Sequence, residues 1–208
     1  MIINQESYDK LKVPQEYCDI FAETSLPSQV KKGLTEEQIH AVQKRGYFLV
    51  KLAQQINAKN IVEVGTAEGY QFYTFGKYIK DSKSAGAVYS CDLRDARSSK
   101  MSGLFLEECL YTKGNSKKLS EVIDPKTKID MFFIDGSHQK GDVVRDIENL
   151  KNHQSNDCVW VFDDYDRRFG IFEELKKIED KYPNTSVIDQ AHKKADNSNN
   201  MLIVWGKM

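Results

Sequence analysis

The chain has few of the features that would place it in a membrane, on nucleic acid or on an export route. No apolar stretch approaches the roughly 18 residues that a membrane-spanning helix needs. Its 30 lysines and arginines are offset by 31 aspartates and glutamates, so a net charge of −1 provides no basic surface for nucleic acid or anionic lipid. The first residues lack the basic and apolar regions of a signal peptide. We therefore expect a cytoplasmic protein without nucleic-acid or membrane partners.

Cysteine is also scarce. Cys18, Cys91, Cys109 and Cys158 are scattered, and none is spaced as a CxxC pair. This pattern argues against a disulfide framework and against a cysteine-based zinc site. We interpret all four as reduced thiols.

At 208 residues, 40% of them hydrophobic, the chain has the size of one domain with a substantial core. Residues 1–34 show weak periodicity, and we interpret them as an N-terminal cap or lid of short helices. A capping-box pattern at Thr35–Gln38 then opens a helix that runs to about Ile56. We expect residues 35–208 to form the main domain.

Downstream of this helix, predicted strands and helices alternate. Apolar runs such as Met131–Ile134 and Val159–Phe162 are typical of strands buried on both faces. Strands are expected near residues 60–64, 87–92, 110–113, 129–134, 158–163, 185–189 and 201–205, and helices near 69–80, 99–108, 116–122, 139–151 and 169–181. Strands joined through helices form parallel units, whereas the last two strands have no helix between them. The expected fold is α/β: a Rossmann-like, seven-stranded, mostly parallel sheet with helices on both faces and a C-terminal antiparallel hairpin.

The turn after the first predicted strand contains two glycines, Gly65 and Gly69, which let the backbone approach a ligand closely. The spacing is neither the GxGxxG of dinucleotide sites nor the Gly-Lys-Ser/Thr of a phosphate loop. Glu63 and Glu68 would oppose a phosphate near the helix N-terminus and tolerate a cation. The loop therefore favours a positively charged, phosphate-free adenosine derivative.

Two further strand ends carry residues that fit such a ligand. Asp92 ends the second predicted strand, where a carboxylate can accept hydrogen bonds from both ribose hydroxyls; the alternative is a strand-end cap. Asn115 and Ser116 follow the third strand in a small polar turn. They could contact the adenine or form an ordinary turn and helix cap.

Five motifs occur in chain order: Glu63-x-Gly65-x-x-x-Gly69, Asp92 at a strand end, Gly114-Asn115-Ser116, Phe133-Ile134-Asp135-Gly136-Ser137-His138 and Phe162-Asp163-Asp164-Tyr165. This set resembles that of class I S-adenosylmethionine-dependent methyltransferases, in particular the metal-dependent small-molecule O-methyltransferases that tailor sugars and antibiotics. The similarity covers roughly residues 35–208. It implies an S-adenosylmethionine-binding domain that methylates a hydroxyl of a small molecule, such as a sugar or a diol.

The resemblance implies that the cofactor lies against the glycine loop and the ends of the neighbouring strands. The expected cofactor-binding residues are Glu63, Gly65, Thr66, Gly69, Tyr70, Asp92, Asn115, Ser116 and Asp135. The chain departs from the family pattern at Asn115, where aspartate is frequent, and at Asp163, where many relatives carry histidine or another residue. The second departure leaves the set of metal ligands open.

Acidic residues end two neighbouring predicted strands, Asp135 after the fourth and Asp163 and Asp164 after the fifth. Carboxylates gathered at one rim repel one another, and a divalent cation relieves the repulsion. Oxygen ligands suit Mg²⁺, Mn²⁺ or Ca²⁺, and the resemblance implies the same three aspartates as metal ligands. Because consecutive strand residues point to opposite sides, Asp163 and Asp164 can both bind a metal only if the strand turns there. The alternative is a pair of solvated loop charges.

His138 follows Asp135 by three residues and is the predicted general base for the substrate hydroxyl, with Asp135 as the second catalytic residue. Asp166 is a less favoured base. The alternative role for His138 is to orient a neighbouring carboxylate.

Other charged residues are expected to be solvated. These are the remaining histidines (His40, His153 and His192) and the charged side chains of the 139–151 helix (Asp142, Arg145, Asp146 and Glu148).

Two other functions stay open. The first is a metal-independent methyltransferase with His138 as its only base. The second is a non-catalytic nucleotide-fold binding module, a homo-oligomer in which the C-terminal strand and the N-terminal segment form the interface. Nucleic-acid N-methylation is disfavoured because residues 135–138 lack the Asn/Asp-Pro-Pro-aromatic turn of those enzymes.

Overall fold

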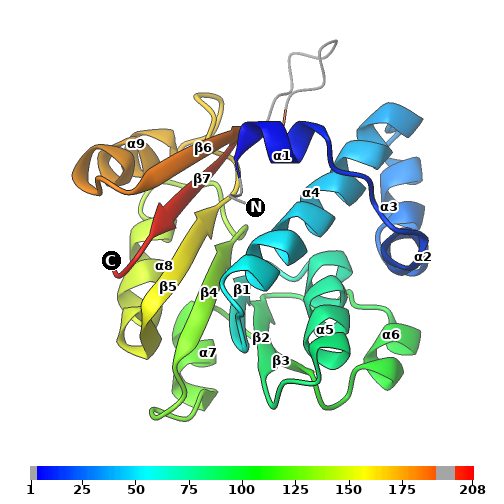
Figure 1. Cartoon of the computed structure of the whole chain (residues 1–208), viewed down its shortest axis with the longest axis horizontal. Helices are drawn as coiled ribbons and strands as arrows, with labels where there is room; N and C mark the ends of the chain where they lie inside the picture. Colours follow the sequence, from blue (N-terminus) through cyan, green and yellow to red (C-terminus); the bar gives the residue numbers. More distant parts are fainter. Residues whose placement is uncertain (1–3, 191–199) are drawn as a thin grey trace.

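The computed structural model describes residues 4–190 and 200–208, in which a seven-stranded sheet carries helices on both faces (Figure 1). The strands are β1 (Asn60–Val64), β2 (Ala87–Asp92), β3 (Cys109–Lys113), β4 (Ile129–Ile134), β5 (Gln154–Phe162), β6 (Thr185–Asp189) and β7 (Asn200–Trp205). Their order is β3-β2-β1-β4-β5-β7-β6. Strands β1 to β5 are parallel, and β7 pairs antiparallel with both β5 and β6. The predicted fold is confirmed.

Two groups of helices enclose the sheet. The helices are α1 (Gln5–Asp9), α2 (Gln15–Glu23), α3 (Leu26–Lys31), α4 (Glu36–Gln55), α5 (Tyr70–Ser82), α6 (Ser99–Leu104), α7 (Ser116–Val122), α8 (Asp142–Leu150), the short 3₁₀ helix η1 (Lys151–His153) and α9 (Phe172–Lys181). Residues of α1, α2, α4, α5 and α6 join one hydrophobic core, and residues of α7, α8 and α9 join the other.

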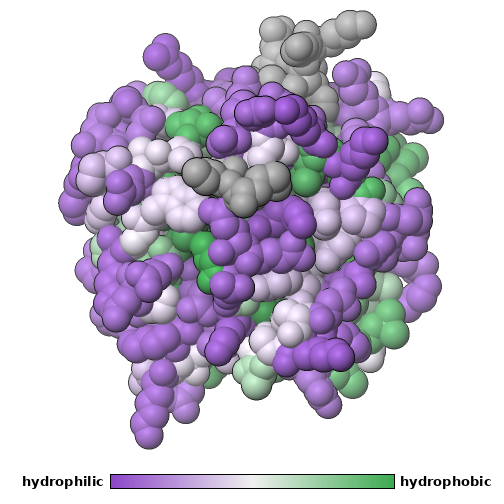
Figure 2. Space-filling view, in the orientation of Figure 1, coloured by the Kyte–Doolittle hydropathy of each residue, from purple (hydrophilic) through white to green (hydrophobic). Residues whose placement is uncertain are grey.

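Alternation along the central strands explains the two cores. Met131 and Phe133 of β4 belong to the core beneath α4 and α5, whereas Phe132 and Ile134 belong to the core beneath α7 and α8. Successive strand residues face opposite sides, so a strand covered on both faces must be apolar throughout. On the face that Figure 2 shows, hydrophilic residues dominate and hydrophobic residues lie in small separate groups.

The N-terminal segment folds into the short helices α1 to α3 and packs on the first core through Tyr8 and Phe21. The capping box predicted for α4 is present, because the Thr35 side chain accepts from Gln38 N and the Gln38 side chain accepts from Thr35 N. Helix α4 thereby connects the N-terminal helices to the sheet.

Strand β5 begins at Gln154, four residues earlier than predicted, because its first half is polar and a register irregularity separates that half from the apolar run. Strand β7 lies inside the sheet, and its residues from Met201 to Val204 are fully buried. Strand β7 does not offer the dimer interface that the sequence suggested, because its apolar surface already belongs to the core. A homo-oligomer stays a prediction.

The predicted surface position is correct for His40 and wrong for His153, which is 6% exposed and lies with Nε2 3.2 Å from Ser120 Oγ. His192 lies outside the described residues. All four cysteines are free. Within residues 4–190 and 200–208, no helix combines the length and apolar character needed to cross a membrane.

Candidate active site

The ends of β1, β4 and β5 lie side by side where the strand order reverses, at the position that forms the ligand crevice of open α/β sheets. The hydrogen-bond ladder continues one step past the strands. The backbone N–H groups of Gly65, Asp135 and Asp163 donate to carbonyl oxygens of neighbouring strand residues at 2.9, 2.9 and 3.0 Å. Asp135 and Asp163 are thereby held on one rim.

The glycine at the end of β1 is required by this close approach. Gly65 has a φ of 99°, and a Cβ at this position would lie 2.0 Å from the carbonyl oxygen of Asp135. Only a residue without a side chain fits between the two strand ends.

Arg45 of α4 provides the counter-charge for the rim. Its guanidinium makes a close ion pair with Asp163 and lies 3.5 Å from an oxygen of Asp135. The Asp163 side chain is 1% exposed, and its other oxygen accepts from Gln190 Nε2 at 3.0 Å. Both oxygens of Asp163 therefore have partners within the protein.

Asp164 is turned toward a different partner. Its φ of 55° places the backbone in the left-handed region, which aspartate tolerates better than most residues, and its carboxylate contacts Nε2 of His138. The turn that the sequence required at this point is present. Burial, together with the charge of Asp163, raises the pKa of Asp164 to about 6. Phe169 supports His138 with a ring-to-ring distance of 4.6 Å.

One group of potential metal ligands lies at this rim. One potential ligand atom from each of Asp135, His138 and Asp164 lies within 4.8 Å of the other two, close enough for all three to bind one cation. Burial and the charge of Asp163 raise the pKa of Asp135 well above its ordinary value. The group contains two members of the predicted ligand set and His138, while Asp163 is engaged with Arg45.

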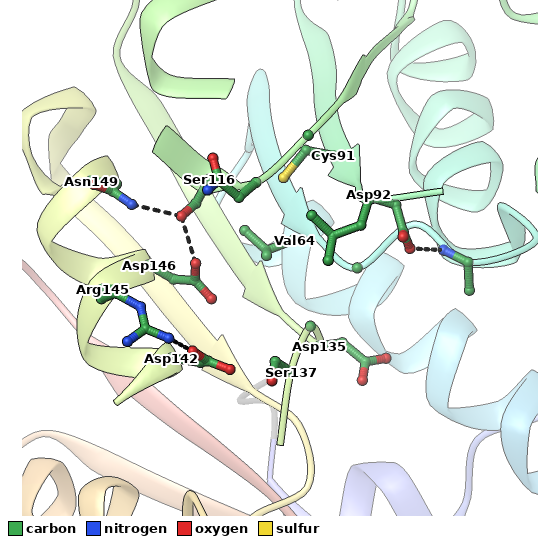
Figure 3. A pocket seen from close by; sticks show the side chains of 16 residues that line it. Val64, Cys91, Asp92, Ser116, Asp135, Ser137, Asp142, Arg145, Asp146 and Asn149 are labelled. Carbon is green, nitrogen blue, oxygen red and sulfur yellow. Dashed lines mark hydrogen bonds and ion pairs between the residues drawn. The ribbon is translucent and has the colours of Figure 1, made fainter. Parts of the chain in front are cut away.

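Two cavities adjoin at these strand ends. The first, of about 510 Å³, is lined by Val64, Gly65, Ala67, Cys91, Asp92, Leu93, Gly114, Asn115, Ser116, Asp135, Gly136, Ser137, Asp142, Arg145, Asp146 and Asn149 (Figure 3). The second, of about 420 Å³, is lined by α3 and α4 residues, the glycine loop, and His138, Asp163 and Asp164. The walls of both include Gly65, Ala67, Asp135 and Gly136. A ligand in one cavity can therefore meet a ligand in the other beside Asp135.

A family model described as a methyltransferase domain matches residues 62–165. The chain belongs to this methyltransferase family. The matched span begins in β1 and ends just past the Asp163–Asp164 pair, so it contains the strand ends that form the rim. No protein of curated function matches the chain.

Solved methyltransferases share the fold of the whole chain. An O-methyltransferase from Bacillus cereus in complex with S-adenosylhomocysteine (SAH) has a TM-score of 0.67 at 16% identity, covering 99% of this chain and 97% of that one. The O-methyltransferase TomG from Streptomyces achromogenes, involved in tomaymycin synthesis, has a TM-score of 0.66 at 13% identity, with coverages of 98% and 94%. The SAH-bound Podospora anserina methyltransferase PaMTH1 has a TM-score of 0.64 at 11% identity, with coverages of 100% and 98%. This is the class I S-adenosylmethionine-dependent fold.

In the methyltransferase, the predicted ribose ligand Asp92 lies in the wall of the first cavity. Its two oxygens accept from the backbone N–H groups of Ala67, at 2.8 Å, and Arg94, at 3.1 Å. A carboxylate has about four acceptor positions, so both oxygens keep capacity for ribose hydroxyls. The two backbone bonds orient Asp92 and tie β2 to the glycine loop.

The candidate adenine contacts, Asn115 and Ser116, also line the first cavity. The Asn115 side chain caps α7 by accepting from Lys118 N at 3.2 Å, so its amide oxygen is engaged as a helix cap. Ser116 is 1% exposed and hydrogen-bonds Asp146 and Asn149 of α8.

Four predicted cofactor residues lie outside the first cavity. Glu63, Thr66 and Tyr70 line the second, and Gly69, with a φ of 96°, caps the N-terminus of α5 without lining either. The Tyr70 hydroxyl donates to the carbonyl of Gln43 in α4, at 3.1 Å.

Arg45, Asp146 and Asn149 were absent from the sequence-based site. The sequence predicts that Asp146 lies on a solvated helix face, but it lines the cavity, and burial raises its pKa above the ordinary value. For Arg45 and Asp146, the spacing from neighbouring apolar residues could have indicated a buried position. Arg45 lies three residues after Val42 and four before Leu49, on the apolar stripe of α4. Asp146 lies three after Val143 and four before Leu150, on that of α8. A charged residue on an apolar stripe indicates a buried partner.

The buried carboxyl of Glu63 predicts a pH-dependent stability. Burial raises its pKa from 4.5 to about 8, although a hydrogen bond from Ser90 opposes the rise. Between these two pH values the folded protein holds a proton that the unfolded chain has released, so the free energy of unfolding falls as pH rises from about 4.5 to about 8. Between pH 5 and pH 8 we expect the free energy of unfolding of Glu63→Gln to fall by about 2–4 kcal/mol less than that of the wild-type protein.

Urea denaturation at a series of pH values measures this difference. Glu107→Gln removes an exposed carboxylate and is the matched control, expected to follow the wild-type protein. Parallel pH profiles for wild type and Glu63→Gln would show that Glu63 is ionised throughout.

Proposed function

We propose that the protein is an S-adenosylmethionine-dependent O-methyltransferase that acts on a hydroxylated small molecule with the help of a divalent cation. The observation that carries this proposal is the pair of adjoining cavities with Asp135 in the shared wall. One cavity suits the methyl donor, the other suits the acceptor, and the titratable groups lie where the two meet.

The first cavity has the chemistry of a nucleoside site without phosphate. Asp92 provides carboxylate acceptors for the ribose, and Val64 and Cys91 provide an apolar floor. The cofactor supplies a methyl group on a positively charged sulfonium. Asp135 lies in the wall toward the second cavity, on the side where the methyl group must leave.

The second cavity holds the groups that handle the acceptor. The contact with Asp164 orients the imidazole of His138, which can act as the base that takes a hydroxyl proton. Gln29 and Lys32, in and just after α3, line the same cavity, so the N-terminal helices contribute to acceptor selection. We therefore assign residues 1–34 a cap role next to the methyltransferase domain of residues 35–208.

Asp135, His138 and Asp164 fit a cation, since two carboxylates and an imidazole converge within 4.8 Å. The imidazole shifts the preference from Mg²⁺ or Ca²⁺ toward Mn²⁺ or another transition ion. A cation held there would lower the pKa of an acceptor hydroxyl and fix its direction. The similarity to TomG, an O-methyltransferase involved in tomaymycin synthesis, supports a small-molecule acceptor.

A metal-independent reaction is the second candidate, and Arg45 favours it. Repulsion among three carboxylates suggested a divalent cation, but Arg45 already provides positive charge to two of them. In that case the His138–Asp164 pair acts alone as the base.

Cofactor binding is tested by titrating the purified protein with SAH in a calorimeter. We expect Asp92→Ala to bind SAH about 10- to 100-fold more weakly, because charge-assisted hydrogen bonds to the ribose are lost. Asp95→Ala is the matched control, since Asp95 lies in the same loop, pairs with Arg97 and does not line the cavity. A wild-type protein that releases no heat with SAH would overturn the proposed function.

Metal binding is tested by titrating Mn²⁺ and following the free ion by electron paramagnetic resonance. We expect Asp164→Asn to weaken Mn²⁺ binding at least about tenfold through loss of an anionic ligand. Asp166→Asn should not, because Asp166 is engaged with Arg168 at 2.9 Å. Methyl transfer to a catechol probe that survives EDTA but is lost in His138→Ala would reject the metal and select the second candidate.

A further inference from the structure

Helix α8 forms the wall of the first cavity on the side away from Asp92 (Figure 3). A short chain of hydrogen bonds runs along this wall. Asn149 Nδ2 donates to Ser116 Oγ at 2.9 Å, and Ser116 Oγ donates to Asp146 Oδ1 at 2.5 Å. A hydroxyl has one proton, so Ser116 has none left for a ligand. The same bond fixes the orientation of the Asp146 carboxylate.

The second oxygen of Asp146 is directed into the cavity. Oδ2 accepts no hydrogen bond from residues 4–190 and 200–208, and Figure 3 shows it pointing away from Ser116 toward the open space beside the strand ends. Ser116 Oγ keeps one unused lone pair. Asp146 and Ser116 thus present adjacent acceptors to a ligand. They suit a group that carries two hydrogens and repel a carbonyl oxygen.

An adenosine ligand brings such a group to this wall. With the ribose on Asp92, the base extends toward α8 over the apolar surface of Val64, Cys91 and the 72% exposed Leu93. The exocyclic amino group of adenine has two hydrogens, whereas hypoxanthine has a carbonyl in its place. We propose that Asp146, oriented by Ser116 and Asn149, accepts a hydrogen bond from the adenine amino group and selects adenosine over inosine forms of the cofactor. This inference rests on the proposed function.

The test compares SAH with S-inosylhomocysteine by calorimetry. We expect the wild-type protein to prefer SAH by about 10- to 100-fold, the range for a hydrogen bond to a charged group. Asp146→Asn replaces a charged acceptor with an amide that can donate to the inosine carbonyl. We expect it to bind SAH at least about tenfold more weakly and S-inosylhomocysteine more tightly than the wild type. Glu148→Gln, an exposed position on α8 that pairs with Lys151, is the matched control and should keep wild-type values.

A measurement on the wild-type protein keeps the inference falsifiable if Asp146→Asn does not fold. The analogue with unsubstituted purine lacks the amino group and should bind about 10- to 100-fold more weakly than SAH. Equal binding of the three nucleosides by the wild type, or unchanged discrimination in a folded Asp146→Asn protein, would overturn the inference while the proposed function stands. Failure of the wild type to bind any of them would overturn both.

Discussion

The ion pair between Arg45 and the strand-end aspartates is the interaction on which the rest of the site depends. Parallel strands bring Asp135, Asp163 and Asp164 to one rim, and burying like charges together is strongly unfavourable without compensation. Arg45 reaches them from α4, a helix that packs on the same face of the sheet as α5. It takes up Asp163, so that the remaining rim carboxylates, Asp135 and Asp164, are the ones placed beside His138. The neighbouring residues Asp163 and Asp164 thus have different partners: Asp163 pairs with Arg45, and Asp164 contacts His138.

The same rim separates the two cavities and connects them. Gly65 lets the ends of β1 and β4 approach closely enough that Asp135 contributes to the walls of both. The loop after β5 turns at Asp164 in the left-handed region, which directs Asp163 to Arg45 and Asp164 to His138. The strand ends thereby place the two cavities, proposed to hold the methyl donor and the acceptor, side by side, while the N-terminal helices and α8 close the outer walls.

The sequence predicted the features that depend on local pattern and missed those that depend on contacts between distant elements. Apolar runs such as Met131–Ile134 identified the strands because both faces of the sheet are covered. Strand-end positions predicted that Asp92 and Asp135 lie at the same rim, where both line the first cavity, because a parallel sheet aligns its carboxyl ends. Arg45 was missed because its partners lie about 90 and 118 residues away, a separation that no local pattern encodes. Asp146 was assigned to solvent because its neighbours Asp142 and Arg145 are charged, although its spacing from Val143 and Leu150 placed it on the buried stripe.

A crystal structure of the protein with SAH and Mn²⁺ would test the account most directly, through the electron density of SAH and the anomalous signal of the metal. We expect the ribose on Asp92, the sulfur at the wall shared by the two cavities, and an anomalous peak among Asp135, His138 and Asp164, with Asp163 still paired to Arg45. An SAH molecule outside the first cavity, or Asp92 and Asp164 facing spaces that do not connect, would contradict it.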